Sequence, residues 1–198
     1  MIIHNCEQRT DEWFALKLGK FSASGFSKLM GNKSNKGYQD QLYQVAYERL
    51  TGQRIETYTN KAMQDGIDNE PLARKAYEKE TNQLVDEVGF IELNDFVGVS
   101  PDGLVNDNGM LEIKCPQCNT QIDYLIKNKL PSEYKYQVYG QLWIAEREWN
   151  DFYSWHSDLP ALRIRVYRDE KIIKELSERV NEAIEETQNI LNQLKKRL

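Results

Sequence analysis

The feature that most constrains the fold is a segment at residues 96–116, which reads FVGVSPDGLVNDNGMLEIKCP. Two apolar runs, Phe96 to Val99 and Met110 to Cys115, flank turn-forming residues at Pro101-Asp102-Gly103 and Asp107-Asn108-Gly109. Apolar runs separated by such turn residues are typical of a short antiparallel hairpin. The segment therefore predicts a hairpin near the middle of the chain.

The second apolar run alternates apolar and charged side chains. Leu111, Ile113 and Cys115 are apolar, whereas Glu112 and Lys114 lie between them. Because successive side chains of a strand point to opposite faces, one face is apolar and the other carries a carboxylate beside an ammonium.

The expected pairing of the hairpin brings a second carboxylate to this charged face. With Asn108-Gly109 as a two-residue turn, Glu112 lies opposite Val105. Asp102 then lies one step along the ladder from the partner of Lys114. The hairpin alone is thus expected to bring Asp102, Glu112 and Lys114 together.

Two converging carboxylates repel each other unless a cation lies between them, and oxygen ligands suit Mg²⁺ or Mn²⁺. Such a metal activates a bound water and neutralises phosphoryl charge, and a lysine can orient that water. This chemistry cleaves phosphodiesters. Pro101-Asp102 followed by Glu112-Ile113-Lys114 resembles the PD-(D/E)xK nuclease signature. Each half alone is usually a turn or a solvated strand face, but both halves on one hairpin favour a catalytic site.

The composition is that of an ordinary globular protein. Of 198 residues, 40% are hydrophobic and 29% charged, and no apolar run is long enough to span a membrane. The first residues lack the pattern of a signal peptide, so a cytoplasmic location is expected. The net charge of -5 is unusual for a DNA-binding protein, but Lys17 to Lys36 contains five lysines and no acid.

The three cysteines offer an alternative metal site. Cys115 and Cys118 form a CxxC pattern, and His4 with Cys6 would complete four ligands for zinc or an iron–sulfur cluster. We disfavour this hypothesis because distant segments would have to converge and no second CxxC exists.

Hydrophobic periodicity and turn residues predict the remaining elements. Gly66 and Pro71 suggest a kink or a restart within one helix. The strand at 84–93 is expected to pair with 96–99 and to form a meander with the hairpin. Gln137 and Gln141 lie on a largely apolar helix, where buried amides need partners. Helices are expected at 11–18, 26–29, 38–50, 60–81, 121–129, 131–146 and 169–198, and further strands at 151–157 and 162–167.

The order of several motifs along the chain resembles the bacteriophage lambda exonuclease and viral recombinase family. The resemblance implies one nuclease domain over residues 1–198, with a restriction-endonuclease-like α/β core, a central mixed β-sheet flanked by helices, and a long C-terminal helix. The matching motifs are Leu16-Lys17-Leu18-Gly19, Ser22-Ala23-Ser24, Gly66-x-x-x-Glu70, Ser100-Pro101-Asp102-Gly103, Leu111-Glu112-Ile113-Lys114-Cys115-Pro116, the helix around Gln137, and Arg168-Asp169-Glu170-Lys171.

The resemblance further implies a 5′-to-3′ exonuclease that degrades one strand of duplex DNA from its end. It would leave a 3′ overhang for a single-strand annealing protein, and relatives can form a ring-shaped homotrimer. Asp102, Glu112 and the Ile113 carbonyl would bind Mg²⁺. Glu70 would assist through a second metal or its waters, and Lys114 would position the attacking water. The residue that would support this site is Gln137.

A second group of residues is expected to hold the terminal 5′ phosphate. The resemblance assigns this role to Lys17, Ser24 and Ser100, and Ser22 and Lys20 adjoin the same helix start, where free N–H groups favour anions. An ordinary helix cap explains the serines equally well. The family usually has arginine where this chain has Lys17, and lysine lacks the planar fork that grips a phosphate twice, so a weaker preference for 5′-phosphorylated ends is expected.

Two other functions are compatible with these residues. The same fold could act as an endonuclease of repair or restriction type, or as a catalytically silent module that binds DNA ends. The complete set of Glu70, Asp102, Glu112 and Lys114 argues against the silent module, because it would have no chemical need for all four.

Overall fold

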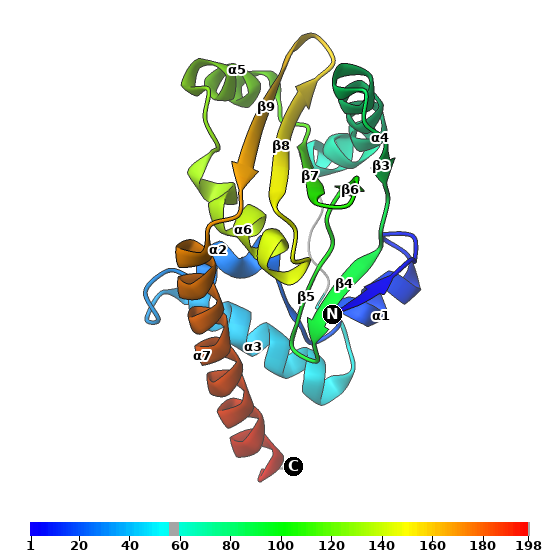
Figure 1. The fold of residues 1–198 in the computed structure, drawn as a ribbon. Helices are drawn as coiled ribbons and strands as arrows, with labels where there is room; N and C mark the ends of the chain where they lie inside the picture. The colour runs from blue at the N-terminus through cyan, green and yellow to red at the C-terminus, as the bar shows by residue number, and fades with distance from the viewer. Residues whose placement is uncertain (56–59, 198) are drawn as a thin grey trace.

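Two mixed β-sheets form the centre of the computed structural model, which describes residues 1–55 and 60–197 (Figure 1). The first sheet has the strand order β1 (Ile2–His4), β4 (Phe90–Asn94), β5 (Val97–Val99) and β2 (Phe21–Ser22). The second has the order β3 (Val85–Asp86), β6 (Gly103–Val105), β7 (Gly109–Lys114), β8 (Trp149–His156) and β9 (Leu159–Tyr167).

Helices surround both sheets, and the expected α/β class with a long C-terminal helix is confirmed. The helix α4 runs without interruption through Gly66 and Pro71, so the expected restart is wrong. None of the helices in the described residues is long and apolar enough to cross a membrane. The helices are α1 (Asp11–Lys17), α2 (Phe26–Leu29), α3 (Lys36–Thr51), α4 (Lys61–Thr81), α5 (Cys118–Lys127), α6 (Lys135–Ile144) and α7 (Glu170–Lys195), with 3-10 turns η1 (Ala23–Gly25) and η2 (Ser132–Tyr134).

The boundaries of the helices follow from their capping residues. The side chains of Thr10, Asn60 and Asp169 accept hydrogen bonds from the first turns of α1, α4 and α7. Gly52 ends α3 in the left-handed region at φ +68°, where glycine is favoured. The predicted helix ends are thus close to the observed ones. The end of the last predicted helix, residue 198, lies outside the described residues.

The hairpin is present, but its register differs from the expected one. Its strands are β6 and β7, paired from Gly103 with Leu111 to Val105 with Gly109. The turn therefore occupies residues 106–108, and Asn106 takes a positive φ of 50°. The expected pairing of Glu112 with Val105 is wrong by three positions. The observed ladder ends just before Asp102 and Glu112, so these two acids are neighbours at its end.

The expected meander is also wrong, because its strands belong to two different sheets. β5 pairs with β4, as predicted, but its other neighbour is β2 in a parallel arrangement. The hairpin strand β6 instead pairs with β3. The predicted strand at 84–93 is thus divided between the two sheets, and the chain passes from one sheet to the other between Val99 and Gly103.

One face of the predicted C-terminal helix, α7, is apolar and packs on the body of the protein. Ile173, Leu176, Val180 and Ala183 are buried in the larger core. Figure 1 shows α7 beside α3, and the two helices are in contact. This core also includes side chains of α2, α3, α6 and the first sheet. A separate cluster lies between α4 and the second sheet, and its members include Tyr77, Leu111, Ile113 and Tyr153.

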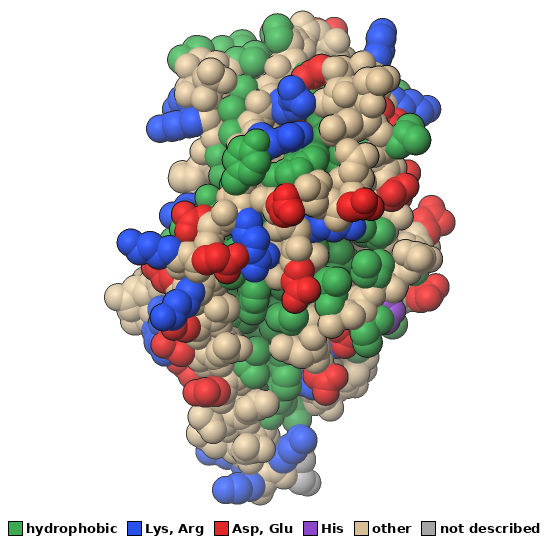
Figure 2. All heavy atoms as spheres, in the orientation of Figure 1, with side chains coloured by type: hydrophobic (Ala, Val, Ile, Leu, Met, Phe, Trp, Pro, Cys, Tyr) green, Lys and Arg blue, Asp and Glu red, His purple; other side chains and the backbone are tan. Residues whose placement is uncertain are grey.

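Acidic and basic side chains are interspersed over the face of the molecule shown in Figure 2. The net charge of -5 therefore does not make this face uniformly acidic. Binding of a polyanion depends on local groups rather than on the net charge.

Gly140 of α6 allows this helix to approach α2 closely. A Cβ at this position would lie 2.5 Å from Cδ2 of the fully buried Phe26. We predict that Gly140→Ala lowers the free energy of unfolding by about 1–3 kcal/mol, because a packed ring cannot move aside. Gly66→Ala is the matched control: its Cβ would only touch the Cys115 carbonyl at 3.8 Å, so urea unfolding should show an unchanged or slightly higher stability. Equal midpoints for the two variants would contradict this packing.

Candidate active site

The strand β7 directs its charged side chains away from α4. Leu111 and Ile113 are buried against α4, whereas Glu112 and Lys114 point to the opposite face. Glu112 is only 1% exposed. The predicted alternation of this strand is therefore confirmed, although the charged face is more deeply buried than that of a solvated strand.

The Glu112 carboxylate is surrounded by donors from β7 and α6. Its Oε1 atom accepts hydrogen bonds from Lys114 Nζ and, at 2.5 Å, from Gln137 Nε2. Its Oε2 atom accepts one from Gln141 Nε2, also at 2.5 Å. The oxygen of Gln141 in turn accepts from Asn150 of β8 at 2.7 Å. Both glutamines of α6 thus donate to the same carboxylate, which gives each amide the hydrogen-bond partner that the sequence indicated it would need.

Asp102 lies beside this carboxylate. Its Oδ2 atom accepts a hydrogen bond of 2.7 Å from the Ile113 amide, which attaches the Asp102 side chain to β7. Burial raises the pKa of Asp102 well above its usual range, and the charge of Glu112 raises it further, while Lys114 partly offsets both effects. The structure therefore brings Asp102, Glu112 and Lys114 together, as the sequence predicted.

Glu70 of α4 approaches the same site through two arginines. Arg74 pairs with Glu70 at 2.9 Å and donates to the Asp102 carbonyl at 3.2–3.3 Å. Arg9 pairs with the other oxygen of Glu70 at 2.5 Å, and its backbone has a positive φ of 70°. Neither arginine belongs to a motif that the sequence predicted for the site. The spacing of Glu70 and Arg74 by four residues in a helix is a usable signal, whereas nothing in the sequence around Arg9 indicates its role.

The donor set at the hairpin fits a hard divalent cation. A metal between Asp102 and Glu112 would offset the repulsion that raises the pKa of Asp102, and carboxylate and carbonyl oxygens are the ligands that Mg²⁺ prefers. In the conformation described, Lys114 and the α6 glutamines hold the oxygens of Glu112. No group of three or more His, Cys, Asp or Glu side chains in the described ranges is arranged as a ready metal cage. The same finding covers the alternative zinc site of His4, Cys6, Cys115 and Cys118, and His4 instead contacts Glu92.

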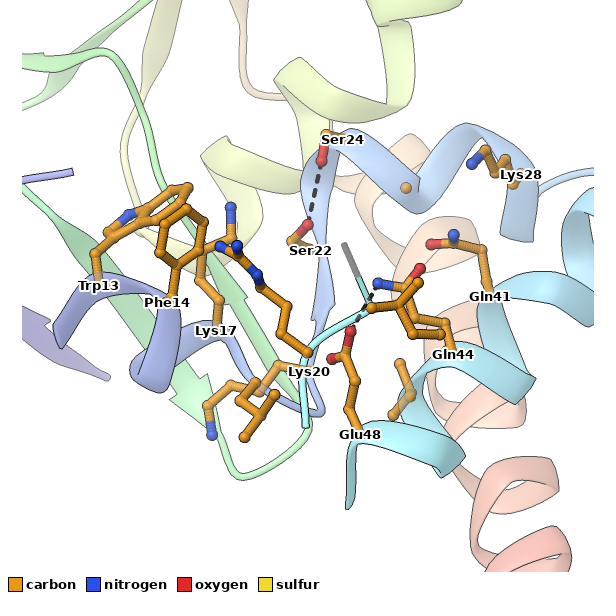
Figure 3. Close-up of a pocket in the computed structure, with 15 residues that line it drawn as sticks. Trp13, Phe14, Lys17, Lys20, Ser22, Ser24, Lys28, Gln41, Gln44 and Glu48 are labelled. Atoms are coloured by element: carbon orange, nitrogen blue, oxygen red, sulfur yellow. Dashed lines mark hydrogen bonds between the residues drawn. The ribbon is translucent and has the colours of Figure 1, made fainter. Parts of the chain in front are cut away.

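A pocket of about 590 Å³ lies beside α1, η1 and α3 (Figure 3). Its lining includes Lys17, Lys20, Ser22 and Ser24, which are four of the five predicted phosphate-binding residues. The two serine hydroxyls are 3.2 Å apart. Ser100 is not part of the lining. The structure therefore gathers most of this predicted group in one pocket.

Trp13 connects this pocket to the hairpin. Its indole Nε1 donates to Ser100 Oγ at 2.8 Å and to the Gly89 carbonyl at 2.9 Å. Lys17 Nζ lies 3.7 Å from the centre of the same indole ring. Ser100 precedes Asp102 by two residues, so one side chain links the pocket to the carboxylate site.

Lys17 is surrounded more by protein than by solvent. Burial, followed by the charge of Arg9, lowers the pKa of Lys17 to about 8, although Asp102 and Glu48 act in the opposite direction. Lys17 is thus mostly charged at pH 7 and loses its charge as the pH rises through 8.

Comparisons with known proteins identify the family and the fold. Residues 12–148 match the family described as the YqaJ-like viral recombinase domain. The structure is similar to that of an alkaline exonuclease from Laribacter hongkongensis, which has also been solved in complex with dAMP. That protein is 36% identical, with a TM-score of 0.89 over 95% of this chain and 97% of the other. No curated protein sequence matches the chain.

A more distant structural similarity supports the fold alone. A phage-related exonuclease from Haemophilus somnus 129PT is 16% identical and has a TM-score of 0.72. The similarity covers 88% of this chain and 96% of the other.

Gln141 should contribute more to stability than Gln137. In Gln141→Leu, a buried oxygen of Glu112 and the amide of Asn150 lose their partner, so we predict a loss of about 1–3 kcal/mol in the free energy of unfolding. Gln137→Leu is the matched control, and its loss should be smaller because Gln137 is only half-buried and water can replace it. Urea unfolding of both variants tests this, and equal losses would refute the difference.

Phosphate binding in the pocket should depend on pH. A terminal phosphate stays doubly charged above pH 7, because its second pKa is about 6. We therefore predict that a 5′-phosphorylated oligonucleotide binds more weakly as the pH rises from 7 to 9, since Lys17 loses its charge. Fluorescence anisotropy in EDTA measures this. Lys17→Arg should remove most of the pH dependence, and a 5′-hydroxyl oligonucleotide is the control. The same pH dependence with both ends would argue against Lys17 as the contact.

Proposed function

Because the chain belongs to the YqaJ-like viral recombinase family, whose match spans both the pocket and the hairpin, we propose that it is a Mg²⁺-dependent 5′-to-3′ exonuclease. It degrades one strand of linear duplex DNA from its end and leaves 3′ single-stranded overhangs. The observation that carries the proposal is the buried Glu112, held beside Asp102 by Lys114 and two glutamines. The exonuclease of L. hongkongensis, solved with the deoxynucleoside monophosphate dAMP, supports the same reaction class.

The carboxylates and Lys114 have different roles in the proposed reaction. Asp102, Glu112 and the Ile113 carbonyl would hold Mg²⁺, or Mn²⁺, and Glu70 would assist at a second metal or its waters. When bound, the metal supplies an activated water and neutralises charge on the phosphoryl oxygens. In the protein without metal, Glu112 and Asp102 raise the pKa of Lys114 despite its burial. Lys114 would act as the donor that orients the attacking water or the phosphate.

The supporting residues keep the acids in place for this reaction. Gln137 and Gln141 fix the orientation of Glu112, and Arg74 joins Glu70 to the backbone of Asp102. The pocket at Lys17 would receive the terminal 5′ phosphate, which would set the polarity of digestion. We further propose that the enzyme acts in the cytoplasm as a ring-shaped homotrimer and passes its overhang to a single-strand annealing protein.

Digestion of end-labelled DNA tests the proposal. Linear duplexes labelled at one 5′ or one 3′ end are incubated with Mg²⁺ or EDTA. The wild type should release 5′-end nucleotides only with Mg²⁺, and Lys114→Ala should be slower by about a hundredfold or more, because a positioned donor is lost. Lys195→Ala, at the exposed end of α7, is the matched control and should retain full activity.

Supercoiled plasmid, which has no ends, should remain intact. Its cleavage would show an endonuclease instead. Binding to DNA ends without any cleavage in Mg²⁺ would show a silent end-binding module. Release from the 3′ end would refute the polarity.

A further inference from the structure

The pocket beside α1 contains an arginine that none of the motifs identifies. Arg54 follows the end of α3 by three residues and lies in the pocket lining together with Lys17. Its guanidinium carbon lies 3.6 Å from the centre of the Phe14 ring. The ring holds the guanidinium by a cation–π contact, which leaves the N–H groups at its edge available for hydrogen bonds.

Two cations are thus held over neighbouring aromatic rings of α1. Lys17 Nζ lies 3.7 Å from the centre of the Trp13 ring, and the rings of Trp13 and Phe14 are 4.9 Å apart. Within the described ranges, no carboxylate forms an ion pair with Lys17. Two like charges in one partly enclosed pocket repel each other unless an anion neutralises them. The arrangement therefore favours an anionic ligand between them.

Among the described residues, Glu48, the acid that lines this pocket, forms no ion pair with Lys17 or Arg54 and offsets their charges only in part. Glu48 is 5% exposed, and its two oxygens accept hydrogen bonds from the Gly19 amide at 2.8 Å and from Gln44 at 2.9 Å. Figure 3 shows Glu48 and Gln44 on the α3 side of the pocket. Glu48 thus fixes the turn that follows Lys17, at Gly19, where φ is +68°. Its role is to hold α1 against α3.

We propose that Arg54 supplies the planar guanidinium that binds the terminal 5′ phosphate. The lysine at position 17 cannot provide this group. This inference rests on the proposed exonuclease function and identifies the residue that reads the 5′ end. Arg54 makes two parallel hydrogen bonds to the phosphate, Lys17 adds a point charge, and the hydroxyls of Ser22 and Ser24 donate to the remaining oxygens. The preference for phosphorylated ends is therefore retained, although residue 17 is lysine.

Binding measurements test this assignment independently of cleavage. Duplexes with a 5′ phosphate or a 5′ hydroxyl are titrated in EDTA with the wild type, Arg54→Ala, Arg54→Lys and the control Arg197→Ala. The control removes the same charge from an exposed position two residues beyond the end of α7. The wild type and the control should bind the phosphorylated end about tenfold more tightly than the hydroxyl end. Both Arg54 variants should lose most of this ratio, because lysine restores the charge but not the fork.

Digestion rates with Mg²⁺ on the same two duplexes separate the possible failures. A wild-type preference that Arg54→Ala and Arg54→Lys leave unchanged overturns the role of Arg54, while the exonuclease function stands. An equal loss on both kinds of end shows general DNA binding and also overturns it. A wild type that releases no 5′-end nucleotides refutes the proposed function itself. Thermal melting confirms that each variant is folded.

Discussion

The buried carboxylate of Glu112 is the constraint on which the rest of this structure depends. A charge that is 1% exposed must be stabilised by protein groups, and here an ammonium and two amides do so. These groups come from β7 and α6, and Asn150 of β8 donates a hydrogen bond to the side-chain oxygen of Gln141. The position of α6 over the second sheet is therefore fixed by polar contacts as well as by the close approach of Gly140 to Phe26.

Two further side chains connect the residues beside Glu112 to other parts of the chain. Arg74 joins α4 to the backbone of Asp102, and Trp13 joins α1 to Ser100, two residues earlier. The segment between Val99 and Gly103 also carries the chain from the first sheet to the second. Residues on both sides of this crossing thus belong to one site, with the carboxylates at one end and the cationic pocket at the other.

Much of this arrangement could be predicted from the sequence because local rules govern it. Alternation placed Glu112 and Lys114 on one face, and capping residues gave the helix ends to within a few residues. The predicted register of the hairpin was wrong because Asn106 adopts a positive φ, and the turn occupies the three residues 106–108. Asn favours a positive φ only weakly, whereas Asn-Gly is a strong turn signal. The sequence therefore predicted the turn at Asn108-Gly109.

The remaining contacts could not be predicted because they join distant segments. Arg9 pairs with Glu70 across 61 residues, and Arg54 meets Phe14 across 40. Neither pair has a spacing that a local rule recognises. Gln141 lies between these cases: its place on an apolar helix showed that it needed a partner, but only the fold shows that the partner is Glu112.

Calorimetric titration of Mg²⁺ and Mn²⁺ into the protein without DNA tests most directly whether the Glu112 cluster is a metal site. Glu112→Gln keeps the shape of the side chain but removes its charge, and thermal melting shows whether the variant is folded. The account predicts saturable binding to the wild type that weakens about tenfold or more in Glu112→Gln. Equal affinities for the folded variant and the wild type would contradict it, because the carboxylate at the centre of the site would then hold no metal.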